Sequence, residues 1–247
     1  MKNLLIYVNP NGCFDAESGN LVKIQIENSL GLGWKKDDIL LITNFPYQYQ
    51  EIKSIEVKGG YCPWQKEGSK ITTIVHLFDI GFIGNELYWC HDLDAYQLEP
   101  ISEEELGLEG FDAGFNDYGR KPQWQLGSIF FKNKAEDIFR EIASRMSPKL
   151  DSTRHLLYDE YVMLTMTNEN FNNINNRIKR LNITYDFGMR KIELCYEKAN
   201  KPLKVLHFHP HNPKLNTLAI AMYGRNRIHK PLMNERLIKI FKKYGYQ

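Results

Sequence analysis

The sequence predicts one α/β domain with a mixed, mostly parallel central sheet flanked by helices. Short apolar runs that fit buried strands alternate with helix-like stripes over the first hundred residues, and short loops connect them. The 247 residues, 43% hydrophobic and 25% charged, suffice for the core of one large domain or two small ones. No internal repeat and no low-complexity linker divides them.

The first three elements form a β-α-β unit. Residues 4–8 are an apolar run that stops at a turn, Asn9-Pro-Asn-Gly12, as a buried strand does. A helix from about Ser18 to Leu30 follows and is closed by Gly31. Residues 38–43 form the second strand, which this order of elements places parallel to the first.

A shorter third strand over residues 52–57 and a second helix lead to the fourth strand. Ser69 is expected to be the N-cap of that helix, because apolar residues recur at intervals of three and four from residue 71 to residue 78. The fourth strand, residues 86–91, is the most apolar and aromatic in the chain. It ends in an Asp-Leu-Asp sequence.

Beyond residue 98 the pattern is less regular. Residues 99–124 carry no clear period and predict a long surface segment, which in a compact domain is often functional. Further apolar patterns predict strands over residues 126–131 and 205–209 and helices over residues 134–146, 158–166, 171–181 and 232–244.

Two carboxylates, Asp92 and Asp94, end the fourth strand. Ligands of open α/β sheets gather at the carboxyl ends of the strands, and side chains two residues apart on a strand point the same way. Because no Lys or Arg stands beside them in the sequence, the pair indicates a hard divalent cation and a phosphate-bearing ligand. The alternative is a solvated pair at a strand end, since this short motif also arises by chance.

Three histidines, His207, His209 and His211, alternate on a late strand, and Lys214 follows them. On an extended segment these imidazoles share a face. One of them with the two carboxylates, completed by phosphate oxygens and water, is the set expected for Mn²⁺ or Mg²⁺. A zinc site of three histidines is the alternative, but residues two apart on one strand do not easily all reach one ion.

Taken in order, these features resemble those of nucleotide-sugar-dependent glycosyltransferases of the GT-A fold, over residues 1–215. The sequence departs from the family pattern at Gln125, where Asn is commoner, and at His209-Pro210, where a small residue is usual. The second departure leaves His207 and His209 open as the metal ligand. The motifs that carry the resemblance are Asp92-Leu-Asp94, Lys70 near the start of the preceding helix, Gln125 to Phe131, Asp159-Glu160, and Leu206 to Lys214.

The resemblance implies a Rossmann-like GT-A fold. Residues 1–100 would form the nucleotide-binding half, residues 101–215 the half that completes the metal and acceptor sites, and residues 216–247 a basic C-terminal helix. It implies a metal-dependent glycosyltransferase with Mn²⁺ or Mg²⁺ as cofactor and a nucleoside-diphosphate sugar as donor, with a UDP-sugar favoured.

The resemblance also implies roles for individual residues. Asp94 would bind the metal directly, and Asp92 would bind it through water or contact the donor. His207 or His209 would supply a further metal ligand, and Lys214 would contact the diphosphate. The residues implied in binding the donor nucleotide are Tyr7, Val8, Asn9, Thr43, Asn44, Lys70, Asp92 and Lys214.

Catalytic roles are implied for Asp159 and Glu160, together with Asp92. One of the first two would be a general base or a ligand of the donor sugar's hydroxyl groups. A carboxylate that reaches the acceptor hydroxyl predicts inversion, whereas one that only holds the donor leaves retention open. The alternative is a pair of acids that complements a helix dipole.

The acceptor is implied to be a glycan, a lipid-linked glycan or a modified DNA base. Residues 112–124, rich in glycine and aromatic residues, suit either a loop that stacks on an acceptor sugar or an ordinary surface loop. Basic residues gather after Tyr223. They suggest contact with an anionic membrane or with DNA, or simply a solvated helix face.

Two other function classes compete with this interpretation. A nucleotidyltransferase usually has a basic, glycine-rich loop after the first strand, and residues 9–14 contain no basic residue. A non-catalytic nucleic-acid-binding module leaves the carboxylates and histidines unexplained. The cysteines form no C-x-x-C pair, and the N-terminal apolar run is too short for a signal peptide, so we expect a cytoplasmic protein, soluble or peripheral to a membrane.

Overall fold

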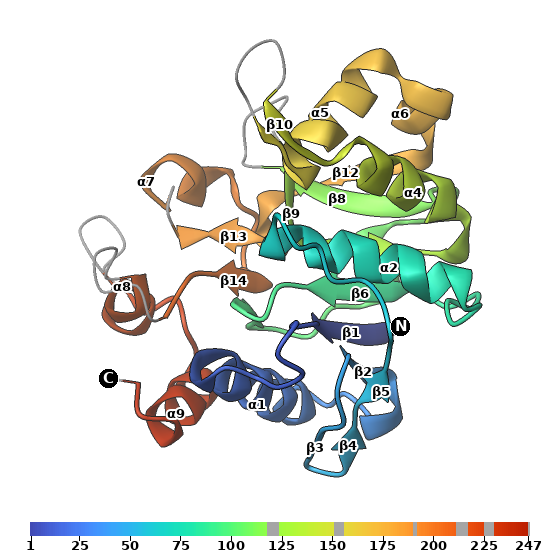
Figure 1. The fold of residues 1–247 in the computed structure, drawn as a ribbon. Helices are drawn as coiled ribbons and strands as arrows, with labels where there is room; N and C mark the ends of the chain where they lie inside the picture. The colour runs from blue at the N-terminus through green and yellow to red at the C-terminus, as the bar shows by residue number, and fades with distance from the viewer. Residues whose placement is uncertain (118–123, 151–155, 190–191, 211–216, 225–229, 247) are drawn as a thin grey trace.

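A computed structural model describes residues 1–117, 124–150, 156–189, 192–210, 217–224 and 230–246. Its centre is a seven-stranded sheet with the order β12-β8-β9-β6-β1-β2-β5 (Figure 1). β9 runs antiparallel to its neighbours β6 and β8, and the other neighbouring strands pair in parallel, which confirms the predicted sheet. The strands are β1 (Lys2–Tyr7), β2 (Ile39–Thr43), β5 (Ile55–Glu56), β6 (Tyr88–His91), β8 (Ala113–Asp117), β9 (Trp124–Phe131) and β12 (Ile178–Leu181).

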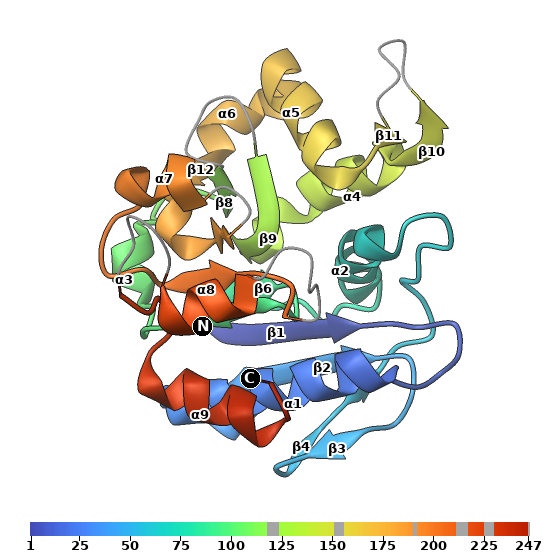
Figure 2. The ribbon, with the colours of Figure 1, turned by 90° about the vertical axis from the view of Figure 1, so that its left-hand side faces the viewer.

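Helices flank both faces of this sheet, as Figures 1 and 2 show. One face carries three helices that pack against one another, α2 (Ser69–Asp79), α4 (Glu136–Arg145) and α5 (Asp159–Glu169). The other face carries α1 (Ala16–Gly31), with α9 (Glu235–Lys243) packed against it.

Neighbouring residues of β1 show why its sequence is an unbroken apolar run. Leu4 belongs to the core under α2, with Ile71, and Leu5 belongs to the core under α1, with Val22. All four side chains are fully buried. A parallel strand covered on both faces is apolar at successive positions rather than at alternating ones.

A smaller three-stranded sheet lies beside the large one. Its middle strand, β14 (Val205–His207), pairs antiparallel with β7 (Ala95–Gln97) and parallel with β13 (Phe187–Gly188). His207 stands opposite Ala95, the residue that follows Asp94. The small sheet therefore delivers a late part of the chain to the turn after β6.

The remaining elements are short. Among the residues that the structure describes, no helix has the length and apolar composition needed to cross a bilayer. The short elements are the strands β3 (Gln48–Tyr49), β4 (Ile52–Lys53), β10 (Ser147–Leu150) and β11 (Leu156–Leu157) and the helices α3 (Glu103–Leu106), α6 (Ile174–Arg177), α7 (Ile192–Cys195) and α8 (Thr217–Tyr223).

The predicted helix over residues 171–181 is wrong. A short 3-10 turn and α6 occupy the first part, and β12 occupies the second, paired in parallel with β8. Asn172 and Asn173 have positive φ angles of 45° and 60°, which no continuous α-helix contains. Asparagine tolerates this left-handed conformation better than most residues.

Three further expectations are corrected. The segment over residues 99–124, expected to be irregular, contains α3 and β8. The third strand, predicted over residues 52–57, is divided, because β4 pairs with β3 in a hairpin and β5 pairs with β2. Ser69 is the first residue of α2 rather than its N-cap, and its hydroxyl oxygen accepts a hydrogen bond from Cys62 N.

Candidate functional site

The Asp-Leu-Asp sequence forms a tight turn at the carboxyl end of β6. Asp92 N donates to Gly127 O (2.8 Å), which extends the pairing of β6 with β9 by one residue. Ala95 N then donates to Asp92 O (3.0 Å) and reverses the chain into β7. The two carboxylates thus converge through this turn, rather than by standing two residues apart on one strand.

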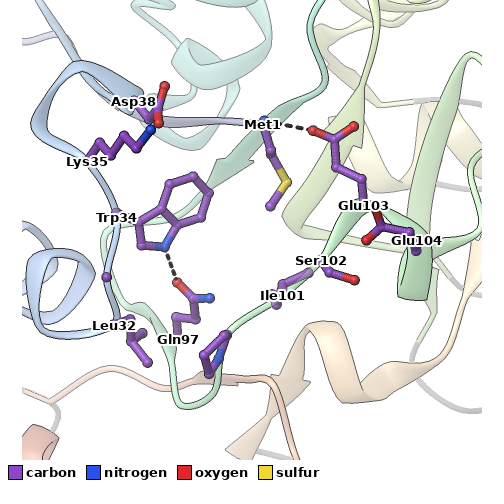
Figure 3. Close-up of a pocket in the computed structure, with 12 residues that line it drawn as sticks. Met1, Leu32, Trp34, Lys35, Asp38, Gln97, Ile101, Ser102, Glu103 and Glu104 are labelled. Atoms are coloured by element: carbon purple, nitrogen blue, oxygen red, sulfur yellow. Dashed lines mark hydrogen bonds and ion pairs between the residues drawn. The ribbon is translucent and has the colours of Figure 1, made fainter.

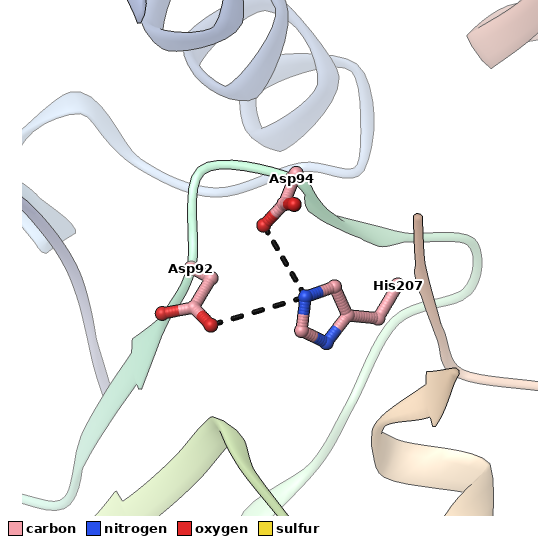
Figure 4. A group of neighbouring side chains, drawn as sticks. All are labelled: Asp92, Asp94 and His207. Atoms are coloured by element: carbon pink, nitrogen blue, oxygen red, sulfur yellow. Dashed lines mark ion pairs between the residues drawn. The ribbon is translucent and has the colours of Figure 1, made fainter. Parts of the chain in front are cut away.

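His207 meets both carboxylates, as Figure 4 shows. Its Nε2 lies 3.3 Å from Oδ1 of Asp94 and 3.8 Å from Oδ2 of Asp92. One ligand atom from each of the three residues lies within 4.8 Å of the others. Two carboxylate oxygens and one imidazole nitrogen at this spacing fit a divalent cation such as Mn²⁺ or Mg²⁺.

His209 lies on the other side of Asp94. Its Nδ1 contacts Oδ2, whereas His207 faces Oδ1, and the two imidazole rings are 6.2 Å apart. The side chain of His209 is 47% exposed, against 18% for His207. His209 therefore contacts a carboxylate of the cluster from outside it.

At Asp94 and His207, pairing with opposite charges shifts the pKa more than burial does. Burial alone would raise the pKa of Asp94, but His207 and His209 hold it far below its ordinary range. Burial alone would lower the pKa of His207, but Asp94 and Asp186 hold it well above its ordinary value. Each of these two groups therefore favours the charged form of the other.

Lys70, on α2, forms an ion pair with Asp92. Its Nζ lies 2.6 Å from Asp92 Oδ1 and also donates to Leu126 O. Burial lowers the pKa of this ammonium, but the negative charges of Asp92 and Asp159 raise it above its ordinary value. The sequence predicts contact of Lys70 with the donor nucleotide, whereas in the structure it contacts a carboxylate of the cluster.

Asp159 and Glu160 stand at the start of α5, next to the same part of β9. Asp159 is buried, and its Oδ1 accepts a hydrogen bond from Glu160 N (2.8 Å) in the first turn of α5. Burial raises the pKa of Asp159, against the positive charge of Lys70. Glu160 Oε1 accepts from Leu126 N (3.4 Å), so Lys70 and Glu160 bind the two backbone groups of one residue.

Five of the residues predicted to bind the nucleotide lie at the carboxyl ends of β1 and β2: Tyr7, Val8, Asn9, Thr43 and Asn44. Asn9 and Asn44 are joined reciprocally: Asn9 N donates to Asn44 Oδ1 (2.9 Å) and Asn44 Nδ2 donates to Asn9 O (2.8 Å). Tyr7 OH accepts from Asn9 Nδ2 (2.8 Å). Thr43 is fully buried and donates its hydroxyl to a backbone carbonyl, so it faces the protein interior. Val8 is also buried and belongs to the core under α2.

Asp186 is a part of the site that the sequence analysis missed. Its side chain is fully buried, and Oδ1 lies 2.9 Å from Nδ1 of His207. The sequence carried one signal, a single carboxylate between apolar and aromatic residues from Ile183 to Phe187. Such a residue is seldom buried without a partner.

Several predicted residues fall outside the described part of the chain. Lys214 and His211 are among them, as are residues 118–123 of the proposed acceptor loop and three of the C-terminal basic residues, 225, 227 and 229. Trp124, at the end of that loop, is buried, with the guanidinium of Arg180 over its ring at 3.7 Å. One face of this indole is therefore already covered.

Two C-terminal cations are engaged within the protein. Arg236 NH1 donates to Asn28 O at the end of α1 (2.9 Å), and Lys243 forms an ion pair with Glu27 (2.6 Å). Both interactions attach α9 to α1. Part of the positive charge predicted to face a membrane or DNA thus has a structural role.

A separate pocket of about 450 Å³ lies at the amino ends of β1 and β2 (Figure 3). Trp34 forms part of its wall and donates Nε1–H to Gln97 Oε1 (2.8 Å). Carboxylates of Glu103 and Glu104 lie at its edge. None of the predicted site residues lines this pocket, which is at the opposite edge of the sheet from Asp92.

Comparison with known proteins supports the fold. No protein-family model matches this sequence, and no curated protein is significantly similar to it. Among solved structures, the chain is similar to the glycosyltransferase GlyE of Streptococcus pneumoniae TIGR4, with a TM-score of 0.57 and 12% identity, over 100% of this chain and 60% of that one. It thus spans less than two thirds of the length of GlyE.

Two further structures match over nearly their whole length. The galactosyltransferase LgtC, solved with donor and acceptor sugar analogues, gives a TM-score of 0.54 at 10% identity, over 98% of this chain and 96% of that one. Mouse xyloside xylosyltransferase 1 gives 0.52 at 12% identity, over 86% and 98%. At these identities the likeness shows the fold, which is the expected GT-A fold.

Proposed function

We propose that this protein is a metal-dependent glycosyltransferase that moves a sugar from a nucleoside-diphosphate sugar to an acceptor. The observation that carries the proposal is the meeting of Asp92, Asp94 and His207 at the carboxyl edge of a GT-A sheet. That edge is where open α/β sheets bind their ligands. A UDP-sugar is the favoured donor, and the acceptor is a glycan, a lipid-linked glycan or a modified nucleobase.

The three side chains would hold Mn²⁺ or Mg²⁺. When bound, such an ion stabilises negative charge on a diphosphate leaving group. Asp94 and His207 would be direct ligands, because Nε2 of His207 lies nearer to Asp94 (3.3 Å) than to Asp92 (3.8 Å), and Asp92 would bind the ion or the donor. His209 would support Asp94 from its other oxygen.

The remaining residues would bind and orient the substrates. The nucleotide would lie over the ends of β1 and β2, near Tyr7 and the Asn9–Asn44 pair. Lys214 would contribute positive charge near the diphosphate. Lys70 would fix the carboxylate of Asp92, with which it forms an ion pair.

Asp159 or Glu160 would act as a general base or would hold hydroxyl groups of the donor sugar. Burial raises the pKa of Asp159, which strengthens that carboxylate as a base. None of the four cysteines forms a disulfide bond, and three of them are buried, which supports a cytoplasmic, reducing compartment for this reaction.

The proposal is tested first by thermal unfolding with UDP or GDP, each with and without Mn²⁺. We expect a stabilising shift that needs both nucleotide and metal. Slow hydrolysis across a panel of nucleotide sugars then identifies the donor. Absence of any metal-dependent shift across the panel, with retention on DNA at moderate salt, would replace this proposal with a nucleic-acid-binding role.

Substitution tests the catalytic claim. Asp94→Ala should abolish donor hydrolysis while the protein keeps its circular dichroism spectrum. Asp38→Ala is the matched control, because this carboxylate pairs with Lys2 at the opposite edge of the sheet. Full activity in Asp94→Ala would refute the site.

A further inference from the structure

Asp186 lies directly behind the imidazole of His207. It immediately precedes β13, and the pairing of β13 with β14 places Gly188 opposite His207. No part of the Asp186 side chain is exposed, and its Oδ1 is 2.9 Å from Nδ1 of His207. The other ring nitrogen, Nε2, faces Asp92 and Asp94. The ring thus connects a buried carboxylate to the cluster.

A second side chain competes for the same ring nitrogen. Gln125 Nε2 lies 3.5 Å from His207 Nδ1. An amide nitrogen donates only, and a carboxylate accepts only, so the two neighbours require opposite protonation of Nδ1. The shorter contact is the one to Asp186, which keeps the proton on Nδ1. The lone pair of the neutral ring is then on Nε2, toward Asp92 and Asp94.

On one side of this pair, β9 packs closely against both side chains at Gly127. A Cβ atom at Gly127, on β9, would lie 2.4 Å from both Cε1 and Nδ1 of His207. It would also lie 2.8 Å from Oδ2 of Asp186. The absence of a side chain at this position therefore lets β9 pass directly against the Asp186–His207 pair.

We propose that Asp186 is a positioning residue of the metal site, which fixes the orientation and the tautomer of His207 so that Nε2 is free to bind the ion. This inference rests on the proposed function, because that function supplies the ion. Asp186 acts only through His207. Carboxylates that orient a metal-binding histidine in this way typically change metal affinity by about 10–100-fold.

The experiment is a Mn²⁺ titration of the full chain, followed by electron paramagnetic resonance. We expect Asp186→Ala to weaken Mn²⁺ binding by about 10–100-fold. Asp186→Asn should fall between wild type and Ala, because its amide oxygen still accepts from Nδ1 but carries no charge. Spin-echo modulation from an imidazole nitrogen on Mn²⁺ should weaken in parallel, which a merely structural role would not produce.

Gln125→Leu is the matched control, since it changes the other neighbour of the same ring nitrogen. It should keep the affinity and the nitrogen signal. Equal losses in Gln125→Leu and Asp186→Ala would overturn the inference, as would wild-type binding in Asp186→Ala. If Asp186→Ala does not fold, Asp186→Asn decides alone, and wild-type affinity in it overturns the inference.

The two proposals fail in different ways. If wild-type protein binds no Mn²⁺, the metal-dependent function fails, and the role of Asp186 fails with it. If wild-type protein binds Mn²⁺ and the Asp186 variants bind it equally well, the role of Asp186 alone is refuted.

Discussion

Lys70 and Asp92 form an ion pair with 2.6 Å between Nζ and Oδ1, and this pair joins α2 to the turn after β6. The ammonium is 9% exposed and the carboxylate 37%. The lysine also faces the buried Asp159 and the carbonyl of Leu126. One cation thus offsets the negative charge of two carboxylates beside the proposed metal site.

Lys70→Met should destabilise the protein by about 1–3 kcal/mol, because it leaves neighbouring carboxylates without their cation. Urea unfolding of the metal-free protein measures this. The double variant with Asp92→Asn should lose less than the sum of the single variants, because the second change removes the unpaired charge. Strict additivity would show that the two residues do not interact in solution.

His207 and His209 should differ in their effect on metal binding. His207→Ala removes a proposed ligand nitrogen and should weaken Mn²⁺ binding by at least the roughly 10–100-fold that loss of a residue supporting a metal ligand costs. His209→Ala removes only a contact to the outer oxygen of Asp94 and should weaken it less. Isothermal titration with Mn²⁺ distinguishes them, and a larger loss in His209→Ala would reverse the assignment.

The stability of the metal-free protein should depend on pH through His207. Its pKa in the folded protein lies above the ordinary value of 6.5, so it stabilises the fold fully below pH 6.5, and this contribution is lost as pH rises through the folded pKa. Asp94 has a lowered pKa, so its contribution is present above pH 3.8 and is lost as pH falls.

Urea unfolding in EDTA between pH 5 and 9 measures the alkaline loss. His207→Gln should flatten this part of the profile. An unchanged slope in His207→Gln would assign the pH dependence to other groups.

Gly127→Ala should displace His207, because the added methyl group would lie 2.4 Å from two ring atoms. We expect lower stability and weaker Mn²⁺ binding together. Gly19→Ala is the control: this glycine lies in α1, and its Cβ would meet Phe14 at an ordinary 3.4 Å. Alanine in a helix interior should stabilise by up to about 1 kcal/mol. Thermal unfolding of both variants tests the contrast.

The first half of the fold was predictable because its strands are covered on both faces. Because most residues of β1, β2 and β6 are buried, the sequences of these strands are apolar runs that can be recognised without the structure. β12 was not predictable in this way. It is an edge strand in which Lys179 and Arg180 stand between two buried residues, and these cations bind Gly107 O and Asp117. Its sequence therefore shows no apolar run.

The candidate site was partly predictable for a related reason. Asp92 and Asp94 directly follow an apolar strand, where two closely spaced negative charges indicate a bound cation. His207 ends a second apolar strand. Asp186 could be placed only with the fold in hand, because its partner lies on a different strand. Thr43 ends β2, and its buried hydroxyl donates to the carbonyl of Phe45, so its role in nucleotide binding stays a prediction.

The pairing of β14 also has a consequence for the motions of the protein. His207 belongs to a sheet of short strands, whereas Asp92 and Asp94 follow a strand of the large sheet. Separating His207 from Asp94 thus requires disruption of the short ladder between β14 and β7 and not of the central sheet. Amide hydrogens of β14 should exchange with solvent sooner than those of β1. An ion held between the two sheets would tie them together and slow that exchange.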